Sequence, residues 1–123
     1  MNLNDLPPQA QQMIQQLQQQ QQQLQQILSQ KSELKTQEQE IQKALDELEN
    51  TDEDEDVFKA VGPILVKSTK NDLEDDMSSK KEKIETRTKM LENKENDLKK
   101  KVNENQQKLQ QMMAGGGQQE EAG

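Results

Sequence analysis

Apolar residues recur along most of the chain at alternating spacings of three and four, with polar residues between them. In residues 8–50 one series with a seven-residue period starts at Ala10, and a second starts at Met13. In residues 69–113 the main series starts at Met77. Heptads of this kind are typical of helices that pack side by side as a coiled coil. The pattern therefore predicts a mainly α chain with two long helices.

Between the two helical patterns lies the short aliphatic stretch VFKAVGPILVK, residues 57–67. Gly62 and Pro63 suit a two-residue turn that would pair Val61 with Ile64, which predicts a β-hairpin. Both faces of this hairpin would be largely apolar, and an isolated two-stranded hairpin is marginal in water. We expect it to join hairpins of other chains, although a simple turn that caps the coiled coil is the alternative. The expected assembly residues are Val57, Phe58, Val61, Gly62, Pro63, Ile64, Leu65 and Val66.

A short connection between two long helices requires them to run antiparallel. If facing residue numbers sum to about 122, the two seams meet along the whole pair, although a slip by one heptad remains an alternative. In this register the central layers pair one apolar with one polar residue, as Ile27 with Glu95 and Leu34 with Thr88. Each such layer forgoes part of the roughly 1.5–3 kcal/mol available from a buried aliphatic side chain. We expect thinly stabilised, compliant helices.

The remaining segments are predicted to be a linker, a helix cap and the two ends of the chain. Residues 51–56 contain five consecutive acids and predict a solvated linker, because they lack the glycine and the spacing of a calcium loop. Thr69 is placed to cap the second helix. Residues 1–7 and 114–123 are expected to be flexible ends.

The composition argues against catalysis, metal binding, nucleic-acid binding and membrane insertion. Apolar residues make up 28% and aromatic residues 1% of the chain, and the net charge is −8. Composition alone would therefore favour a disordered chain. The prediction of a folded chain depends on the heptad periodicity. Cysteine and histidine are absent, and no serine has a nearby base in the arrangement of a catalytic triad. We therefore expect no enzyme, no metal site and no cofactor. The acidic charge argues against nucleic acid, and no apolar run is long enough for a membrane span. We expect a cytoplasmic protein.

At the free ends of the two helices, apolar residues outnumber the seam positions. Ile14 follows Met13 and Met113 follows Met112, so Ile14 and Met113 lie off the seam and are expected to be exposed. Methionine adapts to partners of many shapes, and an exposed apolar patch usually marks an interaction site. Ordinary seam packing is the alternative, above all for Leu17, Val102 and Leu109. The expected binding set is Leu6, Met13, Ile14, Leu17, Val102, Leu109, Met112 and Met113.

Two long helices around a hairpin with the sequence VGPILVK at residues 61–67 resemble the β-class subunits of prefoldins, most closely the archaeal ones. The resemblance covers residues 8–113. It implies a hexamer of two α-class and four β-class subunits whose hairpins form a double β-barrel platform. It also implies an ATP-independent chaperone, a holdase that captures unfolded polypeptides and passes them to a group II chaperonin. The alternative is a structural or regulatory coiled-coil scaffold without unfolded clients.

Overall fold

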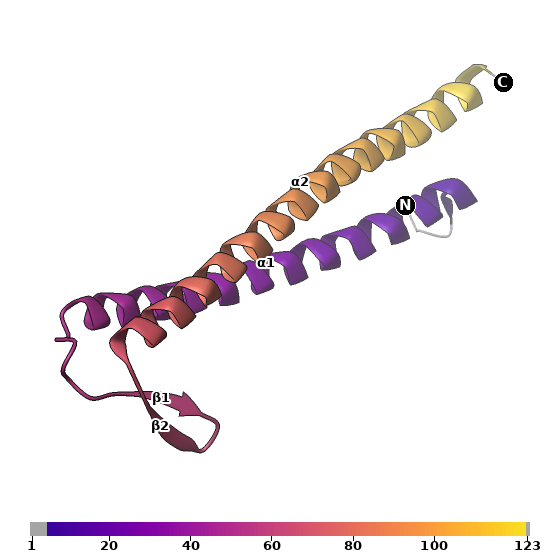
Figure 1. Cartoon of the computed structure of the whole chain (residues 1–123). Helices are drawn as coiled ribbons and strands as arrows, with labels where there is room; N and C mark the ends of the chain where they lie inside the picture. The colour runs from indigo at the N-terminus through magenta and orange to yellow at the C-terminus, as the bar shows by residue number, and fades with distance from the viewer. Residues whose placement is uncertain (1–4, 123) are drawn as a thin grey trace. The chain divides into compact units, whose positions relative to one another are not determined.

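The computed structural model describes residues 5–122, with side chains through Ala114, so the predicted flexible residues 1–4 and 123 lie outside the described residues. The order of elements is helix, hairpin, helix, as predicted (Figure 1). The elements are α1 (Pro8–Glu49), β1 (Val57–Val61), β2 (Ile64–Ser68) and α2 (Lys70–Ala122).

The chain forms two compact units, and each contains antiparallel segments of α1 and α2. The free-end unit comprises Met1–Ser29 and Leu91–Gly123. The hairpin unit is Gln30–Met90 and includes both strands. Each unit has its own stretch of the seam between the helices.

The start of α1 follows from two prolines and a glutamine. Pro8 occupies the first turn, where its missing N–H costs no hydrogen bond. The backbone N–H of Gln11 donates to the Pro7 carbonyl at 3.1 Å, and its side-chain Nε2 donates to the Leu6 carbonyl at 3.0 Å. The side chain of Gln11 thus satisfies a carbonyl in the segment that leads into the helix.

The start of α2 agrees with the sequence-based prediction, whereas its end lies beyond the predicted one. At its start, the Asp72 backbone N–H donates to the Thr69 Oγ1 at 3.1 Å, which confirms the predicted cap. At its other end the helix extends through Gly115–Gly117 to Ala122, beyond the predicted end at 113. A formed helix adds one hydrogen bond per residue, whereas each glycine costs about 1 kcal/mol relative to alanine. The glycines therefore weaken these turns without excluding them, and the flexibility of 114–123 stays a prediction.

The core of both units is the seam, and the predicted seam positions are buried or half-buried while most residues between them are exposed. Two of the buried residues are polar, Gln20 and Glu95. The buried set is Ala10, Leu17, Gln20, Ile27, Leu34, Leu48, Leu73, Ile84 and Glu95.

The first turn of α2 departs from the predicted seam. The heptad placed Glu74 there, but the structure buries Leu73, which shares a hollow with Leu48 and Met77. Glu74 is half-buried, and its carboxylate lies 3.9 Å from Lys70 Nζ. Burying leucine removes apolar surface from water, whereas burying glutamate would cost its hydration. The helix therefore rotates its leucine inward where the hairpin begins.

The observed register agrees with the predicted one in each unit. In the hairpin unit, Lys81 Nζ donates to Gln42 Oε1 at 2.8 Å. In the free-end unit, Asn105 Nδ2 donates to Gln20 Oε1 at 3.1 Å. Both contacts lie within about three residues of the predicted pairing, well short of a heptad slip.

The Gln20–Asn105 layer yields a test of how the register is fixed. Replacing Asn105→Leu leaves the buried Gln20 amide without this partner, so we expect a loss of about 1–2 kcal/mol in the free energy of unfolding. Replacing both by leucine makes the layer apolar, so stability should return to or exceed that of the parent chain. Denaturant unfolding followed by circular dichroism measures both effects.

Gln106→Leu, at the exposed neighbouring position, is the control and should change stability little. An Asn105→Leu variant as stable as the parent chain would show that this hydrogen bond contributes nothing to the pairing of the helices.

Candidate functional site

The hairpin has the register that the sequence predicts. Val61 pairs with Ile64 next to the turn, and the ladder runs to Val57 opposite Ser68. Gly62 has a φ of +56°, a conformation that glycine adopts at little cost. Pro63 follows with its φ fixed by the ring, so both turn residues suit a tight hairpin.

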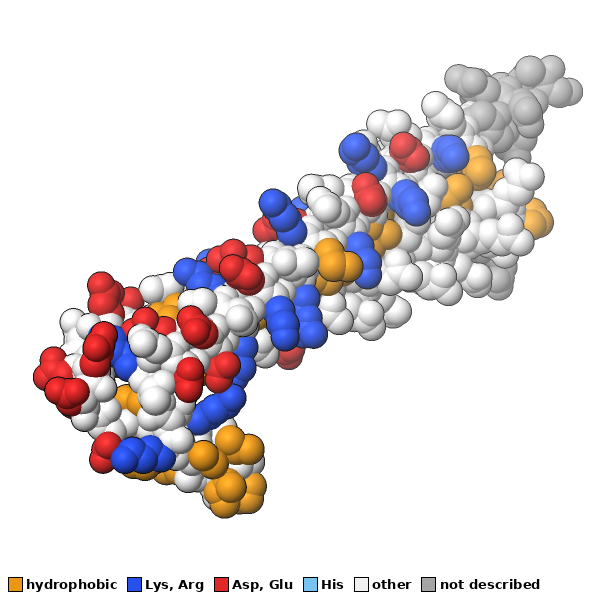
Figure 2. Space-filling model, in the orientation of Figure 1, with side chains coloured by type: hydrophobic (Ala, Val, Ile, Leu, Met, Phe, Trp, Pro, Cys, Tyr) orange, Lys and Arg blue, Asp and Glu red, His pale blue; other side chains and the backbone are white. Residues whose placement is uncertain are grey.

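Both faces of the hairpin expose aliphatic or aromatic side chains. Residues alternate between faces along a strand, so Val61, Ile64 and Val66 share one face, whereas Phe58 and Leu65 share the other. Their exposed fractions run from 45% for Val66 to 72% for Leu65. Figure 2 shows this apolar cluster at the end of the hairpin. An uncovered apolar surface of this kind marks an interaction site.

The base of the hairpin packs against the helices. Val57 and Phe58 line a hollow together with Leu48, Leu73 and Met77. Val57 and Lys59 of β1 are half-buried, whereas Ala60, Val61 and residues 64–67 around the turn are exposed. The strands are therefore fixed at their base and free at their tip.

An ion pair fixes β1 to α2. Lys59 Nζ lies 2.8 Å from Asp76 Oδ2, and both side chains are about 40% exposed. The hydrogen bond and the charge of Lys59 hold the pKa of Asp76 below its usual value, and the charge of Lys80 acts in the same direction. A second pair, Lys67 with Asp56 at 3.2 Å, joins β2 to the acidic linker.

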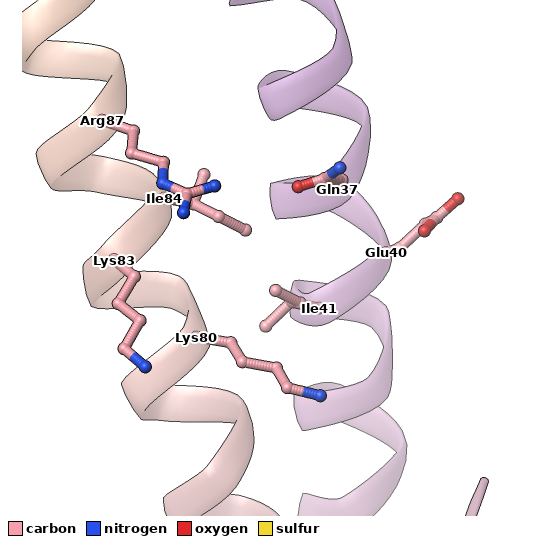
Figure 3. Close-up of a pocket in the computed structure, with 7 residues that line it drawn as sticks. All are labelled: Gln37, Glu40, Ile41, Lys80, Lys83, Ile84 and Arg87. Atoms are coloured by element: carbon pink, nitrogen blue, oxygen red, sulfur yellow. The ribbon is translucent and has the colours of Figure 1, made fainter. Parts of the chain in front are cut away.

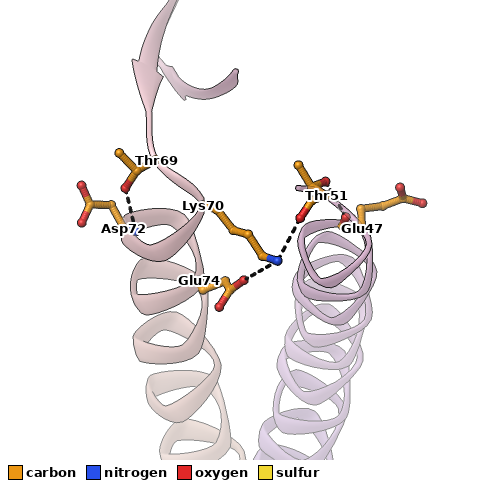
Figure 4. A network of polar contacts seen from close by, with 6 residues as sticks. All are labelled: Glu47, Thr51, Thr69, Lys70, Asp72 and Glu74. Carbon is orange, nitrogen blue, oxygen red and sulfur yellow. Dashed lines mark hydrogen bonds and ion pairs between the residues drawn. The ribbon is translucent and has the colours of Figure 1, made fainter. Parts of the chain in front are cut away.

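A lysine bridges the helix ends where the hairpin leaves them (Figure 4). The last turn of α1 has no basic residue, and five acids follow it, although the carboxyl end of a helix favours positive charge. Lys70, from the first turn of α2, donates to the Thr51 carbonyl at 2.9 Å and lies 3.9 Å from Glu74. The second helix thus supplies the cation that the end of the first one lacks.

At the free ends, the predicted binding residues differ in exposure. Met113 is 46% exposed, as expected for an off-seam residue. Ile14 was expected to be exposed but is half-buried. A position that flanks the seam lies close to the facing helix, which covers part of the side chain. Leu17 is buried in the seam. The others are half-buried: Leu6, Met13, Val102, Leu109 and Met112.

Two exposed apolar residues escaped the heptad analysis. Leu28, in the free-end unit, is 51% exposed, and Met90, in the hairpin unit, is 56% exposed. Neither belongs to a seam series, and this departure from the heptad is the sequence signal that identifies them. Single exposed apolar residues are common on protein surfaces, so we assign them no role.

Among the described residues, no group of three or more acidic side chains is arranged to hold a metal ion. No described helix combines the length and the apolar character needed to cross a bilayer.

A family model described as "Prefoldin subunit" matches residues 11–116, which include the seam, the linker and the hairpin. The chain belongs to the prefoldin family. This confirms the resemblance drawn from the hairpin sequence. Membership implies assembly with other prefoldin subunits and a chaperone role, in a family whose members are generally not enzymes.

Similar proteins include two curated archaeal relatives, each named prefoldin subunit beta. The protein from Archaeoglobus fulgidus is 41% identical over 112 residues, which cover 91% of this chain and 97% of the relative. The protein from Methanocella arvoryzae is 47% identical over 107 residues, which cover 87% and 85%. The crystal structure of the prefoldin beta subunit from Thermococcus strain KS-1 superposes with a TM-score of 0.79 at 39% identity, covering 86% of this chain and 93% of that one.

The ion pair at the base of this prefoldin hairpin predicts a pH response. Because Lys59 lowers the pKa of folded Asp76, the pair stabilises the fold fully above the ordinary aspartate range. This contribution is lost as the pH falls through the folded pKa, below about pH 4. In a Lys59→Met variant, the pKa of Asp76 should rise toward its ordinary value, which carboxyl-carbon NMR titration measures.

Lys67→Met is the matched control, because Lys67 pairs with Asp56 and not with Asp76. A pKa of Asp76 that stays low in the Lys59→Met variant would show that another group sets it.

Proposed function

We propose that the chain is the β-class subunit of an ATP-independent holdase. Four copies would join two α-class prefoldin subunits through a double β-barrel platform built from the hairpins. The free ends of the helices would capture unfolded polypeptides in the cytoplasm and pass them to a group II chaperonin. In this proposal the apolar residues of the hairpin would serve assembly. Capture would use the residues expected at the free ends, which are Leu6, Met13, Ile14, Leu17, Val102, Leu109, Met112 and Met113.

The observation that carries the assembly step is the exposure of apolar residues on both faces of the hairpin. Phe58 and Leu65 on one face, and Ile64 on the other, are each more than half exposed in the single chain. Edge strands with uncovered backbone groups favour pairing with further strands. Because the base of the hairpin is fixed to the helices, pairing requires little ordering, which lowers the entropic cost of association.

The capture step rests on weak contacts that act together. Met113 is exposed at the free end, and Met112 beside it is half-buried. One such surface offers little area, so a single contact would bind weakly. Several subunits in one assembly raise the effective concentration of the remaining surfaces for the same unfolded chain.

Assembly is tested at Leu65. Leu65→Asp should leave the helical content of the single chain unchanged, because the side chain is 72% exposed. It should prevent hexamer formation with an α-class subunit, because an unpaired carboxylate would be buried in the platform. Light scattering coupled to gel filtration measures the mass of the assembly.

The matched control is Leu28→Asp, an equally drastic change at an exposed leucine on a helix. A Leu65→Asp chain that still forms the hexamer would refute assembly through this face of the hairpin.

Capture is tested by the double variant Ile14→Ser with Met113→Ser. We expect the hexamer to persist and its suppression of aggregation of a denatured client to fall several-fold, because several weak apolar contacts are lost at once. Leu28→Ser with Met90→Ser is the control, since it removes two exposed apolar residues outside the proposed site.

Equal loss in both double variants would refute a site at the free ends. A hexamer of the parent chain that never suppresses aggregation would refute the chaperone function and favour the scaffold alternative.

A further inference from the structure

A groove in the hairpin unit runs beside the seam between α1 and α2 (Figure 3). Ile84, which is buried, and Ile41, which is half-buried, contribute its apolar floor. The remaining lining is polar and mostly cationic, and its cations come from α2. The full lining is Gln37, Glu40, Ile41, Lys80, Lys83, Ile84 and Arg87.

The three groove cations, Lys80, Lys83 and Arg87, are exposed, and no described carboxylate forms an ion pair with them. Glu40 lines the same groove, but its carboxylate points away from α2 (Figure 3). The cations follow one another at spacings of three and four residues, where like charges repel each other on a helix. Apart from the favourable effect of the Lys80 charge on Asp76, folding gains no ion pair from these cations among the described residues. An anion from another molecule would relieve their repulsion.

The sequence of α2 repeats part of this pattern. The position occupied by Lys80 and Arg87 is basic again at the next three heptads, Lys94, Lys101 and Lys108. The heptad position that flanks the seam on the same side of α1 is glutamine at 16, 23, 30 and 37. Acidic residues at these α1 positions would neutralise the cations across the seam, as in many coiled coils. Their absence keeps the cations available to a ligand.

The spacing of the cations indicates the geometry of a ligand. Lys80 and Arg87 are seven residues apart, or about 10 Å along the helix axis. An extended peptide covers about 10 Å in three residues. Carboxylates three residues apart can therefore reach both ends of the groove, and an aliphatic side chain between them would meet Ile41 and Ile84.

We propose that this groove binds extended segments of unfolded polypeptide in which acidic residues three apart flank an aliphatic one. The inference rests on the proposed holdase function and adds a second, charge-selective client contact, separate from the free ends. Nucleic acid fits less well, because phosphates make no use of the isoleucine floor and the chain carries a net charge of −8.

Binding is tested on the full-length chain by fluorescence anisotropy with a labelled peptide of four Glu-Leu-Ser repeats. The triple reversal Lys80→Glu, Lys83→Glu and Arg87→Glu should weaken binding at least about tenfold, because each new carboxylate repels the peptide. The matched control Lys35→Glu, Lys43→Glu and Lys89→Glu changes the net charge equally at exposed positions of the same unit and should weaken it far less.

Peptide variants separate charge from apolar contact. Replacing the glutamates by glutamine, or the leucines by serine, should each weaken binding, and added salt should weaken it further. Glutamine substitutions at the same two sets of positions repeat the comparison without charge reversal, with helical content checked by circular dichroism. Equal weakening by the two triple variants, or tighter binding of an oligothymidine of equal charge, would overturn the proposal.

The outcome is separable from that of the proposed function. A groove variant in the hexamer should lose suppression of aggregation for acidic clients but keep it for basic ones. A hexamer that binds the peptide but protects no client would refute the holdase function and the assignment of the ligand as a client. A hexamer that protects clients but binds no peptide would refute the groove alone.

Discussion

A pair of helices has a single seam in which to bury apolar side chains, and this constraint governs the rest of the structure. In the present chain the seam is also interrupted by polar layers, including the buried Gln20 and Glu95. These residues reduce the hydrophobic gain, but a paired polar layer fixes register, because a shifted helix would leave buried amides without partners. The helices thus obtain a defined alignment at the expense of stability.

At the hairpin end, hydrogen bonds, ion pairs and apolar packing outside the seam add stability to the pair of helices. Lys70 binds the Thr51 carbonyl at the end of α1, and Lys59 pairs with Asp76 at the base of the strands. Lys70 meets the negative end of the α1 dipole, where positive charge is favourable, whereas Lys59 meets a carboxylate near the start of α2. Exposed pairs of this kind are individually weak, so the apolar hollow at Leu73 and Met77 has to contribute as well. Apolar packing and charge together hold the turn in place.

Much of this arrangement could be predicted from the sequence, because it depends on periodicity. A seven-residue period specifies a seam, and a glycine followed by proline specifies a turn, whatever the rest of the chain does. Leu73 was missed because the heptad was extended unchanged into the first turn of α2, where packing under the hairpin decides which side chain turns inward. The partial burial of Ile14 and the absence of a described ion pair at Lys83 depend on distances between helices. Such distances are set by side-chain packing and cannot be counted along the chain.

The same constraint explains why exposed apolar and charged groups are concentrated where they are. A chain with one thin seam cannot bury many apolar residues, so those beyond the seam remain on the surface, as Leu65 and Met113 do. An apolar surface at a rigid hairpin favours strands of defined geometry, because backbone hydrogen bonds require alignment. An apolar surface on a helix imposes no such alignment and can accept chains of any sequence, above all through methionine. In the proposed function, the hairpin would therefore make the selective contacts of assembly, and the apolar free ends of the helices would make the permissive contacts of capture.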